Sequence, residues 1–320
     1  MHPSMEDYLF QLAAKSQSRC PGKYRHYFTH FWNWLTGRKL DPLHATSSDL
    51  HDYQQHLSQE HRTPKGARLS PASQVRHLSV LKDYYHYLER CGVVLVDVSK
   101  PLQYPRVARY TTKRDYFSLQ EVTALLQTQA RRVQQTPKEK LKHAIELRTL
   151  AFLGLAVATG RRHQGLRDLK VADLDFERNE LRVDYEKGRA GRVLPVAGWA
   201  MAAVKEYLAL ARPRFTNAQS SELLFISKKN GRVSHQTDDT LPVLHRRTCE
   251  ENPDLTELPH KKLTMHGLRV TFAKLLFNGG CNLRSVNELM LHSRLSTTAY
   301  YTPLKLEELR ATCQLTHPRA

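Results

Sequence analysis

The sequence predicts a mainly α-helical protein with one small β-sheet, an α+β fold in two parts. Apolar and aromatic residues recur at helical spacing through most of the first hundred residues. Further along the chain, two short strand-like runs flank a single glycine-containing turn. A chain of 320 residues is long enough for two domains with separate cores, and its charged content of 25% is typical of a folded protein.

The N-terminal part is predicted to hold four helices, at residues 5–15, 23–35, 48–58 and 70–90. The second of these carries Phe28, Phe31 and Leu35 at helical spacing. The fourth has a favourable start, because Ser70 is a good N-cap and Pro71 suits the first helical position. We interpret the aromatic residues of these helices as hydrophobic core and not as a platform for stacking bases.

Helical periodicity lapses between residues 99 and 115, where prolines accompany basic side chains. We therefore expect an extended basic linker there. Ser118 and Glu121 then form a capping-box pattern that begins a new helix. The predicted parts of the chain are residues 1–103, a linker at 104–116, a second domain at 117–303 and a tail at 304–320.

The second domain is predicted to be mixed but mostly helical. An apolar helix at residues 147–158 ends at Gly160, so the arginines that follow emerge from a buried, rigid element. Strand-like runs at residues 180–185 and 191–196 predict a β-hairpin, and residues 223–227 are the candidate for a third strand. Further helices are expected at residues 199–210, 238–250, 266–277, 283–290 and 297–301.

The chain is strongly basic. It has 49 Lys and Arg against 31 Asp and Glu, which gives a formal charge of +18. A polyanion is therefore the favoured partner, and nucleic acid is favoured over the alternative of an ordinary basic enzyme. The loop before the fourth helix and the linker hold candidate phosphate contacts, although a merely solvated loop fits the first of them equally well. These candidates are Arg62, Lys65, Arg68, Arg106 and Arg109.

The five cysteines are odd in number and widely scattered, and none forms a Cys-x-x-Cys pair. This pattern disfavours a disulfide framework or a zinc site, and we expect no cofactor. The N-terminus lacks the positive region and apolar core of a signal peptide, and no stretch approaches the length of a membrane span. We expect a cytoplasmic, nucleoid-associated location with access to DNA.

Five separated groups between residues 159 and 302 suit the transesterification of a DNA phosphodiester. Attack on a phosphodiester concentrates negative charge on its non-bridging oxygens, so an enzyme that works without a metal needs fixed cationic donors. Arg162 and Arg269 can supply them, because a guanidinium stays protonated and offers paired N–H donors. Either arginine alone would be interpreted as a surface residue. The groups are Thr159-Gly160-Arg161-Arg162, Tyr185-Glu186-Lys187-Gly188, His266-Gly267-Leu268-Arg269, His292 and Tyr300-Tyr301.

In this order, the groups resemble the catalytic set of the tyrosine recombinase (phage integrase) family. Residues 147–175 resemble the family's first conserved box, whose catalytic arginine is fourth in Thr-Gly-x-Arg, and residues 264–302 resemble the second box. The family pattern His-Ser-x-Leu-Ser-Thr-Thr-x-x-Tyr-Thr matches residues 292–302 without a gap, which favours Tyr301 over Tyr300 as the nucleophile. The resemblance implies the catalytic residues Arg162, Lys187, His266, Arg269, His292 and Tyr301.

Each of these residues has a chemical role that suits it. A free phenol has a pKa of about 10, so Tyr301 needs positive surroundings and a base, for which His266 is the candidate. His292 is the better donor to the phosphate. Lys187 lies where the family's hairpin lysine lies and can protonate the leaving 5′ oxygen, although a turn lysine without a role is the alternative.

The chain departs from the family pattern at three supporting positions. Glu186 precedes the lysine where the family has glycine, and Gly165 stands three positions after the first arginine, where an acidic residue is common. Leu291 stands where the family has glycine before the third-position histidine. These departures concern the subfamily and local packing more than the chemistry, because all six reacting groups are present.

The resemblance implies a site-specific recombinase that requires neither metal nor ATP. Its tyrosine forms a 3′-phosphotyrosyl link, and four protomers on two DNA sites exchange strands through a Holliday junction. A core-binding (SAM-like) helical domain and the catalytic domain would form a C-shaped clamp on the DNA. Expected partners are double-stranded DNA with an inverted-repeat core site, further copies of the chain and, as a further candidate, an accessory DNA-binding protein.

Several alternatives remain open on the sequence. The job is integration, excision, cointegrate resolution or dimer resolution, and early core-binding helices favour a simple recombinase of the Xer or Cre sort. A type IB topoisomerase-like enzyme and a non-catalytic DNA-binding regulator are the alternative functions. The tail at 304–320 has Leu306, Leu309 and Cys313 on one helical face, which suits contact with a neighbouring protomer or packing on its own domain.

Overall fold

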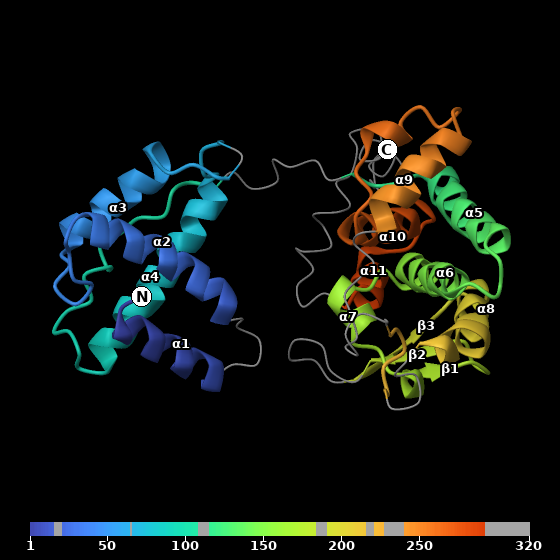
Figure 1. Cartoon of the computed structure of the whole chain (residues 1–320), viewed down its shortest axis with the longest axis horizontal. Coiled ribbons are helices and arrows are strands. Elements are labelled where there is room, and N and C mark those ends of the chain that lie inside the picture. The colour runs from blue at the N-terminus through green and yellow to red at the C-terminus, as the bar shows by residue number, and fades with distance from the viewer. Residues whose placement is uncertain are drawn as a thin grey trace, which may run out of the picture. The chain divides into compact units, whose positions relative to one another are not determined.

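The computed structural model describes residues 1–15, 21–64, 66–107, 115–183, 191–215, 221–226 and 240–291. The chain divides into two compact units, Met1–Thr111 and Thr112–Ala320 (Figure 1). Each unit has a hydrophobic core of its own. The predicted fold class, mainly α with a small β-sheet, is confirmed.

The described part of the first unit contains four helices, α1 (Pro3–Lys15), α2 (Pro21–Gly37), α3 (Ser47–Gln59) and α4 (Pro71–Arg90). Their core is largely aromatic. The rings of Tyr8, Phe28 and Tyr84 meet edge to face, with centroids 5.2 to 5.8 Å apart. Phe31 is fully buried as well. The prediction that the aromatic residues form core is therefore confirmed.

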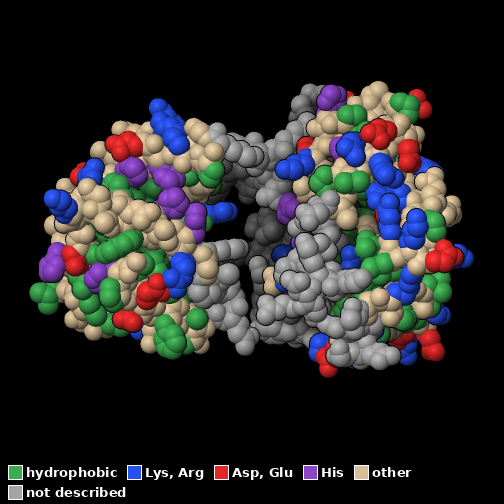
Figure 2. Space-filling model, in the orientation of Figure 1, with side chains coloured by type: hydrophobic (Ala, Val, Ile, Leu, Met, Phe, Trp, Pro, Cys, Tyr) green, Lys and Arg blue, Asp and Glu red, His purple; other side chains and the backbone are tan. Residues whose placement is uncertain are grey.

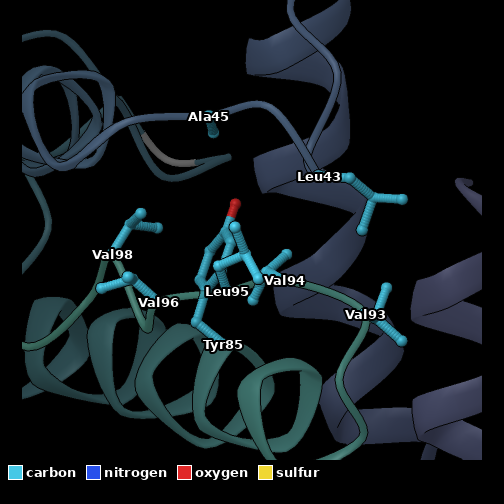
Figure 3. A pocket seen from close by; sticks show the side chains of 8 residues that line it. All are labelled: Leu43, Ala45, Tyr85, Val93, Val94, Leu95, Val96 and Val98. Atoms are coloured by element: carbon cyan, nitrogen blue, oxygen red, sulfur yellow. The ribbon is translucent and has the colours of Figure 1, made fainter.

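The first unit also holds an apolar pocket of about 340 Å³ beside α4 (Figure 3). Its walls come from the segment between α2 and α3, from α4, and from the segment that follows α4. The hydroxyl of Tyr85, one of the lining residues, donates a hydrogen bond to the carbonyl of Pro42 at 2.9 Å. Every other lining side chain is aliphatic, so the pocket offers no reactive group.

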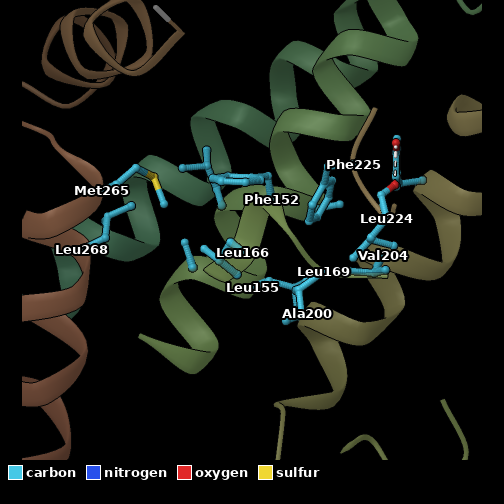
Figure 4. Packing of buried hydrophobic residues seen from close by; sticks show 14 of the residues in the cluster. Phe152, Leu155, Leu166, Leu169, Ala200, Val204, Leu224, Phe225, Met265 and Leu268 are labelled. Carbon is cyan, nitrogen blue, oxygen red and sulfur yellow. Dashed lines mark hydrogen bonds between the residues drawn. The ribbon is translucent and has the colours of Figure 1, made fainter. Parts of the chain in front are cut away.

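The second unit is built around one buried helix. Its described helices are α5 (Leu119–Gln135), α6 (Leu141–Thr159), α7 (His163–Arg167), α8 (Gly198–Glu206), α9 (Thr240–Glu251), α10 (Met265–Asn278) and α11 (Leu283–Leu289). Helix α6 packs against α5, α8 and α10. Figure 4 shows Phe152 and Leu155 of α6 between Met265 and Leu268 of α10 on one side and Val204 of α8 on the other. The elements that carry the predicted site residues thus rest on a shared core.

Helix α6 begins at Leu141, earlier than the predicted start at residue 147. The added turns are buried, because Ala144 is fully covered and Glu146 accepts hydrogen bonds from Gln129 and Arg132 of α5. The sequence pattern missed them because a buried charged residue breaks the apolar run. The predicted helix at 199–210 is α8 followed by a π-helical turn, Tyr207–Ala211.

The sheet has three antiparallel strands in the order β1 (Leu174–Asp175), β2 (Glu180–Val183) and β3 (Arg192–Pro195). Leu181 of β2 pairs with Leu194 of β3, and both side chains are buried. The predicted hairpin is therefore confirmed. The third strand is β1, so the expectation for residues 223–227 is wrong over the described residues. There, Leu223 forms only an isolated bridge with Lys170.

The burial of the residues after Leu223 explains why they form no strand. Leu224, Phe225 and Ile226 are all buried in succession, whereas a strand at the face of a sheet buries alternate residues. The segment therefore fills the core beside α6 and contributes no ladder. Among the described residues, no helix is long and apolar enough to cross a membrane.

Candidate active site

Three of the six predicted catalytic residues are described by the structure, and all belong to the second unit. They are Arg162, His266 and Arg269. The other three lie outside the described residues, as does the alternative nucleophile. These are Lys187, His292, Tyr301 and Tyr300. Of the candidate phosphate contacts, Arg62, Arg68 and Arg106 are exposed, and Lys65 and Arg109 lie outside the described residues.

Helix α6 ends at Gly160 in a conformation that only glycine adopts readily. Its φ is 58°, in the left-handed region, and its N–H donates to the carbonyl of Ala156 at 3.0 Å. A Cβ at this position would lie 2.3 Å from Cδ1 of Phe272 on α10. Glycine is therefore required twice, for the turn and for the close approach of α10.

Arg162 follows directly, as the N-cap of the short helix α7. Its carbonyl accepts the first hydrogen bond of that helix, from the N–H of Leu166 at 3.0 Å. Leu166 is fully buried, so α7 is anchored in the core. The backbone of Arg162 is thus held between two buried residues, while its side chain remains half-buried.

Arg269 lies on α10 and is only 3% exposed. Its guanidinium donates from Nη1 to the carbonyl of Gly160 at 2.7 Å and from Nη2 to the carbonyl of Met290 at 2.6 Å. One side chain therefore joins the end of α6, the middle of α10 and the end of α11. Because Gly160 precedes Arg162 by two residues, the structure brings both predicted arginines to the same junction.

His266 is exposed and lies in the first turn of α10, three residues before Arg269. Residues three apart on a helix share a face, so the histidine and the arginine lie on the same side of α10. Thr264 is the N-cap of the helix, and its hydroxyl accepts a hydrogen bond from the N–H of Gly267 at 2.9 Å. The N–H of Phe117 donates to the hydroxyl of Thr271 at 2.9 Å, which fixes α10 against the segment after the linker.

The sequence analysis missed Arg161, which is only 6% exposed. Its Nη2 lies 3.4 Å from the carbonyl of Gly165, and a Cβ on Gly165 would come within 2.7 Å of the same nitrogen. The guanidinium of Arg161 therefore fills the space that a side chain at position 165 would need. A side chain at position 165 would therefore require this guanidinium to shift. No pattern in the sequence marks the contact.

Leu291 also departs from the family pattern, and its backbone shows the consequence. Its φ is 52°, in the left-handed region that the family's glycine can adopt without steric strain. A residue with a Cβ is disfavoured there by about 1–2 kcal/mol. Leu291 is 9% exposed, so burial of its side chain offsets the strain. The turn at Leu291 follows Met290, the residue that Arg269 holds.

One group of described residues could bring three metal-ligand atoms within 4.8 Å of one another, and it lies in the first unit. It consists of His86, Glu89 and Asp97. A carboxylate oxygen of Glu89 already accepts from Nζ of Lys100 at 2.6 Å, and Oδ1 of Asp97 accepts from the hydroxyl of Ser99 at 2.5 Å. An ion would have to displace these partners, so we assign no metal to this group.

The arrangement of the second unit agrees with the comparison to known families. The model of the phage integrase family matches residues 123–308, more than half of the chain. The chain belongs to the phage integrase family. This recombinase is 30% identical over 325 residues to the tyrosine recombinase XerC of Roseiflexus castenholzii, a match that covers all of this chain and 95% of that protein. It is also 30% identical over 287 residues to the tyrosine recombinase XerD of Proteus mirabilis, covering 89% and 83% of the two chains.

Solved structures share the fold. One is the XerH site-specific recombinase in a post-cleavage complex with palindromic difH substrate, with a TM-score of 0.66, 18% identity, and coverage of 92% of this chain and 79% of that one. Another is the Tn1549 transposon integrase in complex with circular intermediate DNA, with a TM-score of 0.63, 18% identity, and coverage of 97% and 98%. The predicted class, a tyrosine recombinase that binds DNA, is confirmed, and the topoisomerase alternative is not favoured.

Proposed function

We propose that this recombinase cuts and rejoins DNA strands with the six residues Arg162, Lys187, His266, Arg269, His292 and Tyr301. One observation carries the assignment of the arginines. Arg269 is hydrogen-bonded to Gly160, two residues before Arg162, so two permanently charged side chains start from one rigid junction. Fixed cations of this kind stabilise the charge that develops on a phosphate under attack, because they need no reorganisation during the reaction.

The proposed reaction conserves the number of phosphodiester-type bonds. The hydroxyl of Tyr301 attacks the scissile phosphorus, its proton passes to His266, and a 3′-phosphotyrosyl bond forms as the bond to the 5′ oxygen breaks. Lys187 gives a proton to that oxygen. Attack by a free 5′-hydroxyl reverses these steps and restores the DNA strand, so no nucleotide triphosphate is consumed. Arg162, Arg269 and His292 donate to the non-bridging oxygens.

The base of the hairpin supports the role of Lys187. Position 187 falls between β2 and β3, and Arg192 at the start of β3 forms an ion pair with Glu288 of α11 at 2.9 Å. The same α11 leads to Met290, whose carbonyl accepts from Arg269. The hairpin therefore starts close to the helix that the catalytic arginine contacts. A lysine in the connection between these strands can protonate the leaving oxygen.

We extend the proposal to the assembly. The helical unit is the core-binding domain and the second unit is the catalytic domain, and both contact the duplex. The net charge of +18 suits extensive contact with a polyanion. Four protomers would act on two inverted-repeat sites through a Holliday junction, in the cytoplasm at the nucleoid, with the tail at 304–320 linking protomers. The biological task would be integration, excision, cointegrate resolution or dimer resolution.

A nicked suicide substrate tests the proposal, because the short fragment that carries the free 5′-hydroxyl diffuses away and the covalent complex is trapped. Tyr301→Phe should abolish the complex and leave DNA affinity nearly unchanged, since only the nucleophilic oxygen is removed. Tyr300→Phe is the matched control and should retain cleavage. If Tyr300→Phe is inactive and Tyr301→Phe is active, the nucleophile is Tyr300. A wild-type chain that forms the complex but leaves a synthetic Holliday junction unresolved would act as a topoisomerase-like enzyme instead.

A further inference from the structure

Five histidines gather on one face of the first unit. His26 and His30 come from α2, His56 from α3, His61 from the segment after α3, and His77 from α4. The ring of His30 is central, with centroids 4.6 Å from His26, 4.8 Å from His61 and 5.6 Å from His77. The ring of His56 lies 6.1 Å from that of His61. Figure 2 shows histidine side chains gathered in a row on the visible face of this unit. We call these five residues the histidine cluster.

The cluster holds unused hydrogen-bonding groups. Nδ1 of His56 pairs with Glu60 at 2.7 Å, and Nδ1 of His77, which is 4% exposed, lies 3.4 Å from the hydroxyl of Tyr53. The rings of His26, His30 and His61 contact other rings but make no hydrogen bond with any residue in the described ranges. His26 is exposed, and His30 and His61 are half-buried. Three imidazoles can therefore accept a ligand without losing a protein partner.

Three rings of the cluster, those of His30, His61 and His77, have pKa values that no carboxylate shifts. Burial first, and then the neighbouring histidines, lower the pKa of His30 and of His77, the latter to about 4. Burial, other histidines and Arg62 lower the pKa of His61. The carboxylate of Glu60 pairs with His56 at the edge of the cluster. Within the cluster, His30, His61 and His77 therefore have no anion beside them.

The elements that form the cluster also carry other charged groups. On α2, Arg25 is hydrogen-bonded to Glu6 of α1. On α4, the carboxylate of Asp83 lies 3.5 Å from the hydroxyl of Tyr24 on α2. The exposed cations of the loop after α3 and of the first turns of α4 have no carboxylate partner among the described residues. They are Arg62, Arg68 and Arg76.

We propose that the histidine cluster is a proton-linked contact surface for DNA phosphates, and that the protein takes up protons there when it binds a duplex. The inference rests on the proposed function, because it adds a regulated contact to the DNA-binding unit. Arg62 follows His61 in the chain and pairs through a β-bridge with Arg68, so the cluster adjoins two of the predicted phosphate contacts. A phosphate supplies the anion that His30 and His61 lack.

Linkage gives the direction of the effect. A phosphate within about 4–6 Å favours the charged form of an imidazole, so the pKa of the cluster histidines rises in the complex. Binding then takes up protons and becomes tighter as the pH falls from 8 to 6. For each proton taken up, affinity rises by roughly tenfold per pH unit. Phosphate contacts carry no sequence information, so the effect should be present on any duplex.

The test measures binding of the full-length chain to a random-sequence duplex at constant ionic strength, with EDTA in every buffer. Titration calorimetry in two buffers of different ionisation enthalpy counts the protons taken up, and fluorescence anisotropy between pH 6 and 8 gives the affinity. The test variant is His30→Gln with His61→Gln. The matched control is His44→Gln with His86→Gln, which removes two exposed histidines outside the cluster.

We expect the wild type and the control to take up about one proton or more per protomer near pH 6.5, and the test variant to lose at least half of this uptake. Affinity at pH 8 should be the same for all three proteins. Equal uptake in test and control variants would overturn the proposal. If the test variant fails to fold, the single variant of the exposed His26, His26→Gln, should still reduce the uptake, and an unchanged uptake would again refute it.

The outcome is separate from that of the proposed function. A chain that shows cluster-dependent proton uptake but never forms a covalent complex would refute the assigned chemistry and leave the cluster as a DNA contact. A chain that forms the covalent complex with pH-independent affinity would refute only the present inference.

Discussion

Arg269 donates a hydrogen bond to the carbonyl of Gly160 at 2.7 Å, across 109 residues of sequence. The contact joins the helix that carries His266 to the turn that carries Arg162. Arg269 is only 3% exposed, and a second hydrogen bond, from Nη2 to the carbonyl of Met290, holds its guanidinium in one orientation. The proposed catalytic arrangement and the packing of α6, α10 and α11 therefore depend on the same side chain.

Arg269→Lys should lower both activity and stability. An ammonium lacks the planar pair of donors that reaches two carbonyls, so at least one buried carbonyl loses its partner, at a cost of about 1–3 kcal/mol. We expect the rate of covalent complex formation to fall by about 100-fold or more, as for loss of a preorganised donor. Arg284→Lys, at an exposed position of α11, is the control and should change neither. A normal cleavage rate for Arg269→Lys would show that Arg269 has no catalytic role.

Gly160→Ala should destabilise the second unit through two separate effects. The backbone at φ 58° disfavours alanine by about 1 kcal/mol, and the new Cβ would overlap the ring of Phe272. Gly198→Ala is the matched control, because that glycine has open space around it and its φ is not positive. Urea denaturation should show a clear loss for the first variant and almost none for the second.

Adding Phe272→Ala separates the two effects. Removing the ring relieves the overlap but leaves the backbone strain. The double variant should therefore lose less free energy of unfolding than the sum of the two single variants. If the two losses of free energy are simply additive, the overlap expected from the 2.3 Å distance between the new Cβ and Cδ1 of Phe272 does not occur.

Much of this fold follows from local sequence signals. Ser70 caps α4 by accepting from the N–H of Ser73 at 3.2 Å, and Ser118 forms a capping box with Glu121, both as the residue types predict. The end of α6 at Gly160 was predicted because a left-handed glycine is a common helix stop. These features depend on a few neighbouring residues, so the sequence alone contains them.

Other features depend on contacts that the sequence does not state. The bond from Arg269 to Gly160 needs the packing of two helices, and the guanidinium of Arg161 beside Gly165 needs a buried site to hold it. The left-handed Leu291 breaks a backbone preference that only its burial can offset. The family pattern predicts candidate residues for the chemistry, whereas the contacts that support them depend on the packing of distant segments.

Lys187→Ala tests the proposed acid directly, although the residue lies outside the described structure. Cleavage of an ordinary strand should slow strongly, because the 5′ oxygen is a poor leaving group without a proton. A substrate with sulfur in place of that bridging oxygen should restore the rate, since a thiolate leaves unprotonated. Lys205→Ala on α8 is the control and should cleave both substrates normally. Failure of the sulfur substrate to rescue would exclude Lys187 as the acid.

The buried His77 should make the first unit less stable in acid. Burial lowers the pKa of His77 to about 4, against an ordinary value of 6.5. The unfolded chain therefore binds this proton more readily, so the stabilising contribution is complete above pH 6.5 and is lost as the pH falls through about 4. The difference is worth up to about 3 kcal/mol for this one group, with burial as its main cause.

Urea unfolding followed by tryptophan fluorescence measures the effect, because Trp32 and Trp34 lie in the first unit. The midpoint should fall between pH 7.5 and pH 5 in the wild type. His77→Gln removes the titrating group and should weaken this pH dependence, whatever its effect on stability at pH 7.5. His44→Gln, an exposed histidine, should keep the wild-type dependence. Duplex DNA should protect the wild type most at low pH, because phosphates stabilise the protonated histidine cluster. An equal pH dependence in His77→Gln and the wild type would show that the buried imidazole does not control acid stability.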